Sequence, residues 1–339
     1  MNGAWRRTRI VLAVLLTSAL ALGLSLALPG CGSKYQGTAS LRAGVEKDLN
    51  ELSPYYVARG QGYFTSDGLK IDQSFYTAGA LAIPDLVAGK VDVAFASDYA
   101  TVSKIFNNNN KLRVLASVSL TNINTFVGLR NHGISKPADL RGKTIAVSRG
   151  TAGEYGLGRF LANNDIPLSQ VQIINTAPDQ VPAALASGRI DAAVTWTPFL
   201  FEIEKQQGSN LIEWPETSVP DWYFLAVSTT DAIARKRDAL VRLLDGLNRA
   251  EALINGSPAK AKATVAGQTT LPVSYISTKW KTSIFRLALP QELVTAMEQE
   301  ARWEIDNGLT QTTAVPDYLD YMDASILKAV DPAAVEIYR

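Results

Sequence analysis

Five short loops combine hydroxyl groups with small residues, and each is expected where a strand ends and a helix begins. The first backbone N–H groups of a helix lack partners within it and carry partial positive charge. They can bind an anionic oxygen such as a sulfonate or carboxylate, while small residues let the backbone approach and hydroxyls donate hydrogen bonds. The alternative is that these residues only cap their helices. The loops are residues 52–55, 77–80, 97–99, 150–153 and 195–198.

Charged and aromatic residues near these loops indicate a ligand that is more than a simple anion. Asp98 directly follows a predicted buried strand, so its carboxylate could contact a ligand ammonium or could cap the next helix. Arg149 is the obvious cation near the site, and Tyr99 and Trp196 could provide aromatic walls or cation–π contacts. We therefore expect a zwitterion such as taurine, or an amine-bearing heterocycle, to fit better than nitrate. The predicted ligand-binding residues are Ser53, Pro54, Tyr55, Thr77, Ala78, Gly79, Ser97, Asp98, Tyr99, Asn124, Arg149, Gly150, Thr151, Ala152, Glu154, Thr195, Trp196 and Asp221.

The rest of the composition argues against an enzyme, a metal site and a nucleic-acid partner. The 339 residues include one Cys and one His, so an intrachain disulfide is impossible and a Cys/His zinc site is not expected. His132 lies in the turn-like segment NHGISKP and is interpreted as a surface-loop histidine, not as a base. Lys and Arg number 33 against 32 Asp and Glu, and no basic stripe could neutralise phosphates. We predict no catalytic residue, no cofactor and no bound metal.

One segment that must position these loops occurs twice in the chain. Residues 89–97 read GKVDVAFAS, and residues 188–196 read GRIDAAVTW. In each copy a Gly with positive φ can end a helix, and a basic residue, a β-branched residue, an Asp and a short buried parallel strand follow. Asp92 of the first copy corresponds to Asp191 of the second. The repeat predicts one helix–strand unit in each of two similar lobes, although α/β proteins also produce such pairs by chance.

The wider pattern alternates strands with helices and then becomes helical, which predicts parallel-rich sheets. The late helices lack strands of their own, so we expect them to pack back on the first lobe. The expected late helices are residues 233–255, 258–266, 274–287 and 291–307. The expected strands are residues 41–45, 69–76, 91–96, 112–118, 125–129, 143–147, 171–175, 211–214 and 222–227, besides the strand within the second repeat copy.

The N-terminus has the pattern of an export signal. Arg6, Arg7 and Arg9 precede an apolar stretch at residues 10–28, which is typical of a signal peptide, although a stretch of this length could also be an uncleaved anchor. Leu-Pro-Gly-Cys follows and resembles a bacterial lipobox, with Cys31 as the acylated residue and Pro29 as a departure from the usual small residue. The alternative for Cys31 is an ordinary free thiol. We expect residues 1–30 to be a lipoprotein signal peptide and residues 31–40 a tether.

Four motifs in order and spacing resemble a known family, the nitrate/sulfonate/taurine class of ABC-importer substrate-binding proteins. That class also holds proteins that bind pyrimidine precursors of thiamine. The motifs are YYVA with GYF and GL at residues 55–69, DLRGKTIAVSRGTAGEYGLGRFL at 139–161, ALASGRIDAAVTWTPFL at 184–200 and DYLDYMDASILKAVDP at 317–332.

The resemblance implies an α/β type II periplasmic-binding-protein fold, in which two hinge strands join two lobes with parallel-rich sheets. The ligand would lie in the cleft between the lobes. The hinge strands are expected near residues 125–129 and 222–227, with residues 41–125 plus 226–339 forming lobe 1 and residues 126–225 forming lobe 2.

The function that follows is a lipid-anchored extracytoplasmic receptor that closes over a small polar ligand and delivers it to an ABC permease and ATPase. We expect a monomer that contacts the membrane through its N-terminal lipid. A ligand-sensing module of a signalling system remains an alternative. Fungal pyrimidine synthases resemble this fold, but they use an active-site histidine and a cysteine-rich segment, which this chain does not offer.

Overall fold

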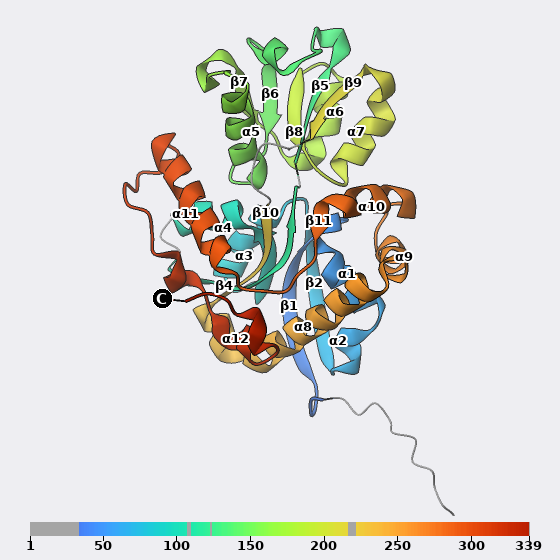
Figure 1. Ribbon diagram of the computed structural model, residues 1–339, viewed down its shortest axis with the longest axis vertical. Helices are drawn as coiled ribbons and strands as arrows, with labels where there is room; N and C mark the ends of the chain where they lie inside the picture. Colours follow the sequence, from blue (N-terminus) through green and yellow to red (C-terminus); the bar gives the residue numbers. More distant parts are fainter. Residues whose placement is uncertain (1–33, 107–109, 123, 216–221, 339) are drawn as a thin grey trace, which may run out of the picture. The chain divides into compact units, whose positions relative to one another are not determined.

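Two β-sheets organise the chain in the computed structural model (Figure 1). The structure describes residues 34–106, 110–122, 124–215 and 222–338. Two predicted functional residues, Cys31 and Asp221, lie outside the described residues, as do the predicted signal peptide and the start of the tether. Both sheets belong to one unit that begins at Tyr35. Among the described residues, no helix combines the length and the apolar character that crossing a bilayer requires.

The first sheet has the strand order β11-β4-β10-β3-β1-β2. β1 pairs in parallel with β2 and β3, whereas β10 runs antiparallel to its neighbours β3 and β4. The carboxyl ends of the parallel strands β1, β2 and β3 therefore lie at the same edge of the sheet, as the predicted site requires. The strands are β1 (Ala39–Glu46), β2 (Leu69–Tyr76), β3 (Val93–Ser97), β4 (Leu112–Thr121), β10 (Trp222–Thr229) and β11 (Ser283–Ile284).

The second sheet has the order β7-β6-β8-β5-β9 and repeats the mixture of directions. β6 pairs in parallel with β7 and β8, and β5 runs antiparallel to β8 and β9. The chain changes sheets between Thr121 and Thr125, and it returns between Pro215 and Trp222. The strands are β5 (Thr125–Leu129), β6 (Thr144–Val147), β7 (Gln172–Asn175), β8 (Ala192–Thr195) and β9 (Leu211–Pro215).

Helices divide between the sheets, and we call each sheet with its helices a lobe. The late helices pack on the first sheet or its helices, as the sequence predicts, because α8 lies against α1 and β1, α11 against α4, and α12 against β4. The second-lobe helices are α5 (Ala152–Asn163), α6 (Val181–Ala186) and α7 (Phe199–Gln207). The first-lobe helices are α1 (Ser53–Gly60), α2 (Tyr63–Ser66), α3 (Ala82–Val87), α4 (Asp98–Ile105), α8 (Thr230–Gly256), α9 (Pro258–Gln268), α10 (Val273–Lys279), α11 (Gln291–Asp306) and α12 (Ala324–Lys328).

One late helix is shorter than predicted. The expected helix at residues 274–287 ends at Lys279, and after a single 3-10 turn Ser283–Ile284 pairs with β4 as strand β11. Beyond it the side chains alternate, because Phe285 and Leu287 are buried while Arg286 between them is exposed. This period of two suits extended backbone and cannot place one face of a helix on the core. The predicted helix was therefore wrong in its second half.

The repeated Asp has a structural role that is the same in both lobes. Gly89 and Gly188 take φ of 71° and 69°, the left-handed conformation expected after each helix. Asp92 Oδ2 then accepts a hydrogen bond from Arg42 N at 2.9 Å, and Asp191 Oδ2 accepts one from Thr144 N at 2.8 Å. Each carboxylate thus ties the start of its strand to the neighbouring parallel strand.

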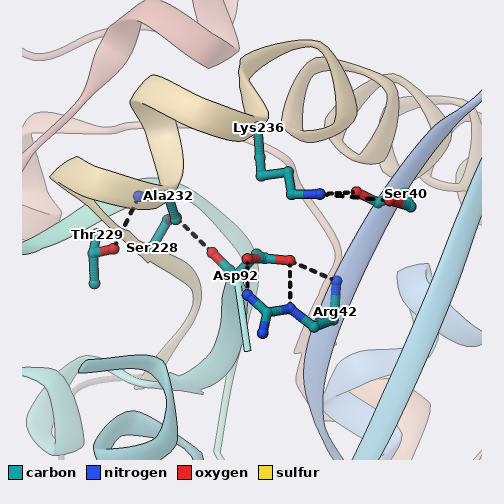
Figure 2. A network of polar contacts seen from close by, with 7 residues as sticks. All are labelled: Ser40, Arg42, Asp92, Ser228, Thr229, Ala232 and Lys236. Atoms are coloured by element: carbon teal, nitrogen blue, oxygen red, sulfur yellow. Dashed lines mark hydrogen bonds and ion pairs between the residues drawn. The ribbon is translucent and has the colours of Figure 1, made fainter. Parts of the chain in front are cut away.

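Both repeated carboxylates also have a basic partner. Figure 2 shows Asp92 held by the Arg42 guanidinium, with Nε 3.1 Å from Oδ2, and its carbonyl accepting a bond from Ser228 Oγ at 2.7 Å. Burial alone raises the pKa of Asp92, but the hydrogen bonds and charge of Arg42 outweigh it and hold the pKa below its ordinary value. In the second lobe His132 Nδ1 lies 2.7 Å from Asp191 Oδ1. His132 does lie in a turn, but its half-buried ring supports this structural Asp.

Candidate functional site

A small cavity lies where the carboxyl ends of the parallel strands of both sheets meet. Its volume is about 20 Å³. Glu46 and Ser97 end β1 and β3 of the first lobe, whereas Thr151 precedes α5 and Trp196 follows β8 in the second lobe. The lining residues are Glu46, Ala78, Gly79, Ala80, Ser97, Ala100, Asn124, Thr151, Ala152, Gly153, Trp196 and Phe224.

The structure brings seven of the predicted ligand-binding residues together at this cavity. They come from the loops at 77–80, 97–99, 150–153 and 195–198 and from the crossing between the sheets. The shared feature is position, because all follow strand ends or begin helices, where ligands of open α/β sheets bind. These residues are Ala78, Gly79, Ser97, Asn124, Thr151, Ala152 and Trp196.

The loop at residues 52–55 does not line the cavity, because its side chains are part of the first-lobe core. Ser53, Pro54 and Tyr55 are buried, and Tyr55 packs against Phe64 and Phe95 at ring-centroid distances of 5.6 and 5.5 Å. Ser53 Oγ donates to the Asn50 carbonyl at 2.5 Å. Helix α1 thus begins inside the core of the first lobe.

Asp98 also lies away from the cavity lining and is used by the protein itself. Its Oδ1 accepts from Tyr99 N at 2.9 Å and its Oδ2 from Tyr223 N at 3.1 Å. Burial raises the pKa of Asp98 to about 7. Glu300 of α11 faces it, and burial followed by the charge of Asp98 raises the pKa of Glu300 well above its ordinary value. The carboxylate therefore joins α4, β10 and α11.

Arg149 and Glu154 pair with each other outside the cavity. Arg149 Nη1 lies 2.8 Å from Glu154 Oε1, and the arginine is exposed. Glu154 Oε2 also accepts from Gly150 N at 2.7 Å, so it closes the loop that leads into α5. The expected cation is thus paired with a carboxylate in the first turn of the next helix. Neither these residues nor Thr77 and Thr195 line the cavity.

Tyr99 forms a contact between the lobes, and it does not provide a cavity wall. Its ring stacks on Tyr155 of α5 at 5.6 Å, and Trp303 of α11 meets Tyr155 edge-on at 5.0 Å. Trp222 joins this buried aromatic cluster. Trp303 is half-buried between helices of the two lobes. These rings give the lobes an apolar contact beside the cavity.

Helix capping explains the side chain of the predicted loop at residues 97–99, but it does not explain that of the loop at residues 150–153. Ser97 Oγ accepts from Ala100 N at 3.2 Å, so it caps α4 while it lines the cavity. At α5 the Thr151 side chain makes no capping bond, and its Oγ1 donates to the Ser148 carbonyl at 2.6 Å. The first turn of α5, a helix of 12 residues, thus faces the cavity with Ala152 and Gly153 and with its partial positive charge.

Five lining residues are absent from the list of predicted ligand-binding residues, although Ala80 and Gly153 belong to predicted loops, and Glu46 is the ionisable one. It is 5% exposed, its Oε2 accepts from Gly79 N at 2.7 Å, and its Oε1 accepts from Trp196 Nε1 at 2.8 Å. The second bond joins the two lobes. Glu46 directly follows the predicted strand at 41–45, the same position after a strand that made Asp98 a candidate, so the signal was present. The five are Glu46, Ala80, Ala100, Gly153 and Phe224.

Burial sets the protonation of Glu46. It raises the pKa of this carboxyl to about 8, although the bonds from Gly79 and Trp196 lower it and the charge of Glu51 adds to the rise. Burial likewise raises the pKa of Glu51 to about 7. Of the described residues that line the cavity, Glu46 is the only ionisable one. Among the described residues, we find no group of three or more His, Cys, Asp or Glu that could hold a metal ion.

Comparison with known proteins places this architecture in a family. The NMT1/THI5-like family model matches residues 50–261, which is more than half of the chain. The chain belongs to the NMT1/THI5-like family. A protein of Brucella abortus described as a binding protein is 25% identical over 259 residues, covering 75% of each chain. The taurine-binding periplasmic protein of Escherichia coli is 32% identical over 154 residues, 45% of this chain and 47% of that protein.

Solved structures confirm the fold. The alkanesulfonate-binding protein of Xanthomonas axonopodis, bound to MOPS, superposes with a TM-score of 0.70 at 19% identity, covering 82% of this chain and 96% of that one. The predicted type II periplasmic-binding-protein fold and the predicted family resemblance are both confirmed. The relatives named above are described as binding proteins, which agrees with the prediction that the chain is not an enzyme. The family match begins at residue 50, four residues after Glu46, so Glu46 lies outside it.

Proposed function

We propose that the protein is an extracytoplasmic solute-binding protein that captures a small polar ligand between its lobes and delivers it to an ABC permease and ATPase. The ligand is sulfonate- or taurine-like, or bears an amine or pyrimidine group. One observation carries this proposal: the cavity takes its lining from both lobes, and the 2.8 Å bond from Trp196 to Glu46 joins them across it. A ligand bound there contacts both lobes at once. The taurine-binding and alkanesulfonate-binding relatives support the sulfonate- or taurine-like ligand.

The cavity dimensions imply a hinge motion. A volume of about 20 Å³ exceeds the roughly 10–15 Å³ that one water needs, whereas a cavity of about 150 Å³ holds benzene. Taurine has about as many non-hydrogen atoms as benzene, so the lobes must part before it can enter. The two crossings between the sheets are the natural hinges. A ligand then stabilises the closed lobes only by binding them more tightly than it binds the open ones.

The N-terminal residues support a lipid anchor outside the cytoplasmic membrane. We propose that residues 1–30 are removed as a signal peptide and that Cys31 carries the lipid, with a monomeric binding protein beyond the tether. Cys31→Ser should abolish labelling by a radioactive or alkyne-bearing fatty acid. Labelling that persists in this variant would refute the anchor and leave ligand binding untouched.

Ligand capture is tested by native mass spectrometry of the purified protein, followed by melting curves with taurine, alkanesulfonates, nitrate, aminopyrimidines and small amines. A ligand at about 100 times its dissociation constant adds about 2.7 kcal/mol of stability, a readily measured shift in melting temperature. Loss of uptake in a deletion strain, restored by the wild-type gene, then separates import from sensing. If no compound shifts the melting temperature and no ligand copurifies, the proposal is wrong.

A further inference from the structure

We propose that Glu46 selects ligands that carry a positively charged amine, by placing a buried carboxylate against that amine. The inference rests on the proposed function and narrows its ligand class. It starts from the composition of the cavity: among the described lining residues Glu46 is the sole ionisable group, and no Lys, Arg or His accompanies it. The expected cation, Arg149, is exposed and paired with Glu154 instead.

The Glu46 carboxylate has capacity left for a ligand. A carboxylate offers about four acceptor positions on its two oxygens. One position on each oxygen is used, by Gly79 N at 2.7 Å and by Trp196 Nε1 at 2.8 Å. These two donors fix the carboxylate from both lobes, so an ammonium group that binds it is held in the closed arrangement. A carboxylate that is fixed in advance loses little freedom on binding.

A purely anionic ligand meets the opposite situation. Its charge would lie near a carboxyl group, with no cation among the described lining residues to compensate. The first turn of α5 suits an anionic group through its partial positive charge, but an anion that lacks an amine gains no charge pair with Glu46. Trp196 and Phe224 also line the cavity and can attract a cation through their ring faces. A molecule with an ammonium at one end and an anion at the other satisfies both sides.

Binding of an ammonium should release a proton. Because burial raises the pKa of Glu46 to about 8, the protonated form predominates at pH 7. Pairing with the ammonium requires the carboxylate, so the Glu46 O–H bond breaks and the proton goes to the buffer, while the ligand keeps its own charge. Glu51 is the titratable neighbour whose charge acts on Glu46, and this charge also raises the pKa of Glu46. An anion that lacks an amine gives no such release.

Calorimetry with two matched pairs of compounds tests the inference. Taurine is compared with isethionate, and β-alanine with 3-hydroxypropionate; within each pair a hydroxyl replaces the amine and the anion is kept. Titrations at pH 7 in phosphate and in Tris count the protons, because the two buffers differ in ionisation enthalpy. We expect one amine to bind at least tenfold more tightly than its hydroxyl analogue and to release close to one proton at pH 7.

Variants separate selection from a purely structural role. E46Q removes the charge and should lower affinity for the amine by about 10- to 100-fold, which abolishes discrimination within the pair. E51Q makes the same change at a buried carboxyl outside the cavity lining and should keep the discrimination. If E46Q fails to fold, the proton count on the wild-type protein still decides the question.

The outcomes distinguish the inference from the proposed function. Equal binding of amine and hydroxyl analogue, or tight amine binding without proton release, overturns the role of Glu46 and leaves a solute-binding protein. If neither amine binds but nitrate or an alkanesulfonate does, the inference fails alone. If no compound of the wider panel binds, both fail.

Discussion

Replacing Gly79 with alanine tests how closely the cavity wall is built around Glu46. A Cβ atom at this position would lie 2.3 Å from the Phe95 carbonyl oxygen and 2.7 Å from Ala96 Cα. Both are main-chain atoms of β3, so no side-chain rotation relieves the contact. Overpacking of this kind costs about 1–3 kcal/mol, and weakening the 2.7 Å bond from Gly79 N to Glu46 costs about 1 kcal/mol more. We expect the free energy of unfolding to fall by about 2–4 kcal/mol.

The assay is urea unfolding of Gly79→Ala beside a matched glycine variant. Gly267 lies exposed near the end of α9, and a Cβ there would meet nothing within 4 Å. Because alanine has the higher helix propensity, Gly267→Ala should leave stability unchanged or raise it by up to about 1 kcal/mol. Gly79→Ala should also weaken binding of whichever ligand the panel identifies. If the two variants unfold alike and bind alike, the reasoning about the cavity wall is refuted.

Three further predictions address the lobes and the buried carboxyls. Trp196→Phe removes the Nε1 donor to Glu46, so the melting temperature should fall. Ligand affinity should also fall about tenfold, which is equivalent to one lost hydrogen bond. Calorimetry that shows unchanged affinity would contradict this prediction. In Gly158→Ala a Cβ would meet Trp303 at 2.3 Å, so we expect weaker ligand binding and a lower melting temperature even though alanine favours helix; a gain in stability would show that the rings yield. Burial raises the folded pKa of Glu46 to about 8 and of Glu51 to about 7, from an ordinary value of 4.5. The contribution of these two groups to stability is therefore complete below pH 4.5 and is lost as pH rises through 7–8, by at most about 1.4 kcal/mol per pKa unit. The ligand-free protein should melt at a lower temperature at pH 9 than at pH 6, and the reverse order would refute the assignment.

Local patterns were sufficient to predict most elements and the repeat. The range 69–76 alternates as a strand and is β2. The Gly and Asp of the repeat act within a few residues of chain and one neighbouring strand, so their sequence signal is direct. By contrast, residues 283–284 pair with β4 because of a tertiary contact that no local helix preference reveals.

The candidate site was predictable as a set of loops but not as a set of contacts. Strand ends and helix starts identified Gly79, Thr151 and Trp196, because sheet geometry alone brings such positions to one edge. The same rule could not foresee that the Asp98 carboxylate would accept from Tyr223, a residue far along the chain. Glu46 was missed because the strand was predicted to end at residue 45. Glu46, which is the last residue of the observed strand β1, was therefore given no role.

The central claim is that two lobes close over a small ligand, and a distance between them measures it directly. Lys205 of α7 and Lys260 of α9 are exposed residues of different lobes. Cysteines introduced at both positions in a Cys31→Ser background, spin-labelled and measured by double electron–electron resonance, report the separation with and without saturating ligand. We expect a broad distribution that narrows and shifts when the ligand identified by the melting panel is added. An unchanged distribution at saturation would contradict hinge closure.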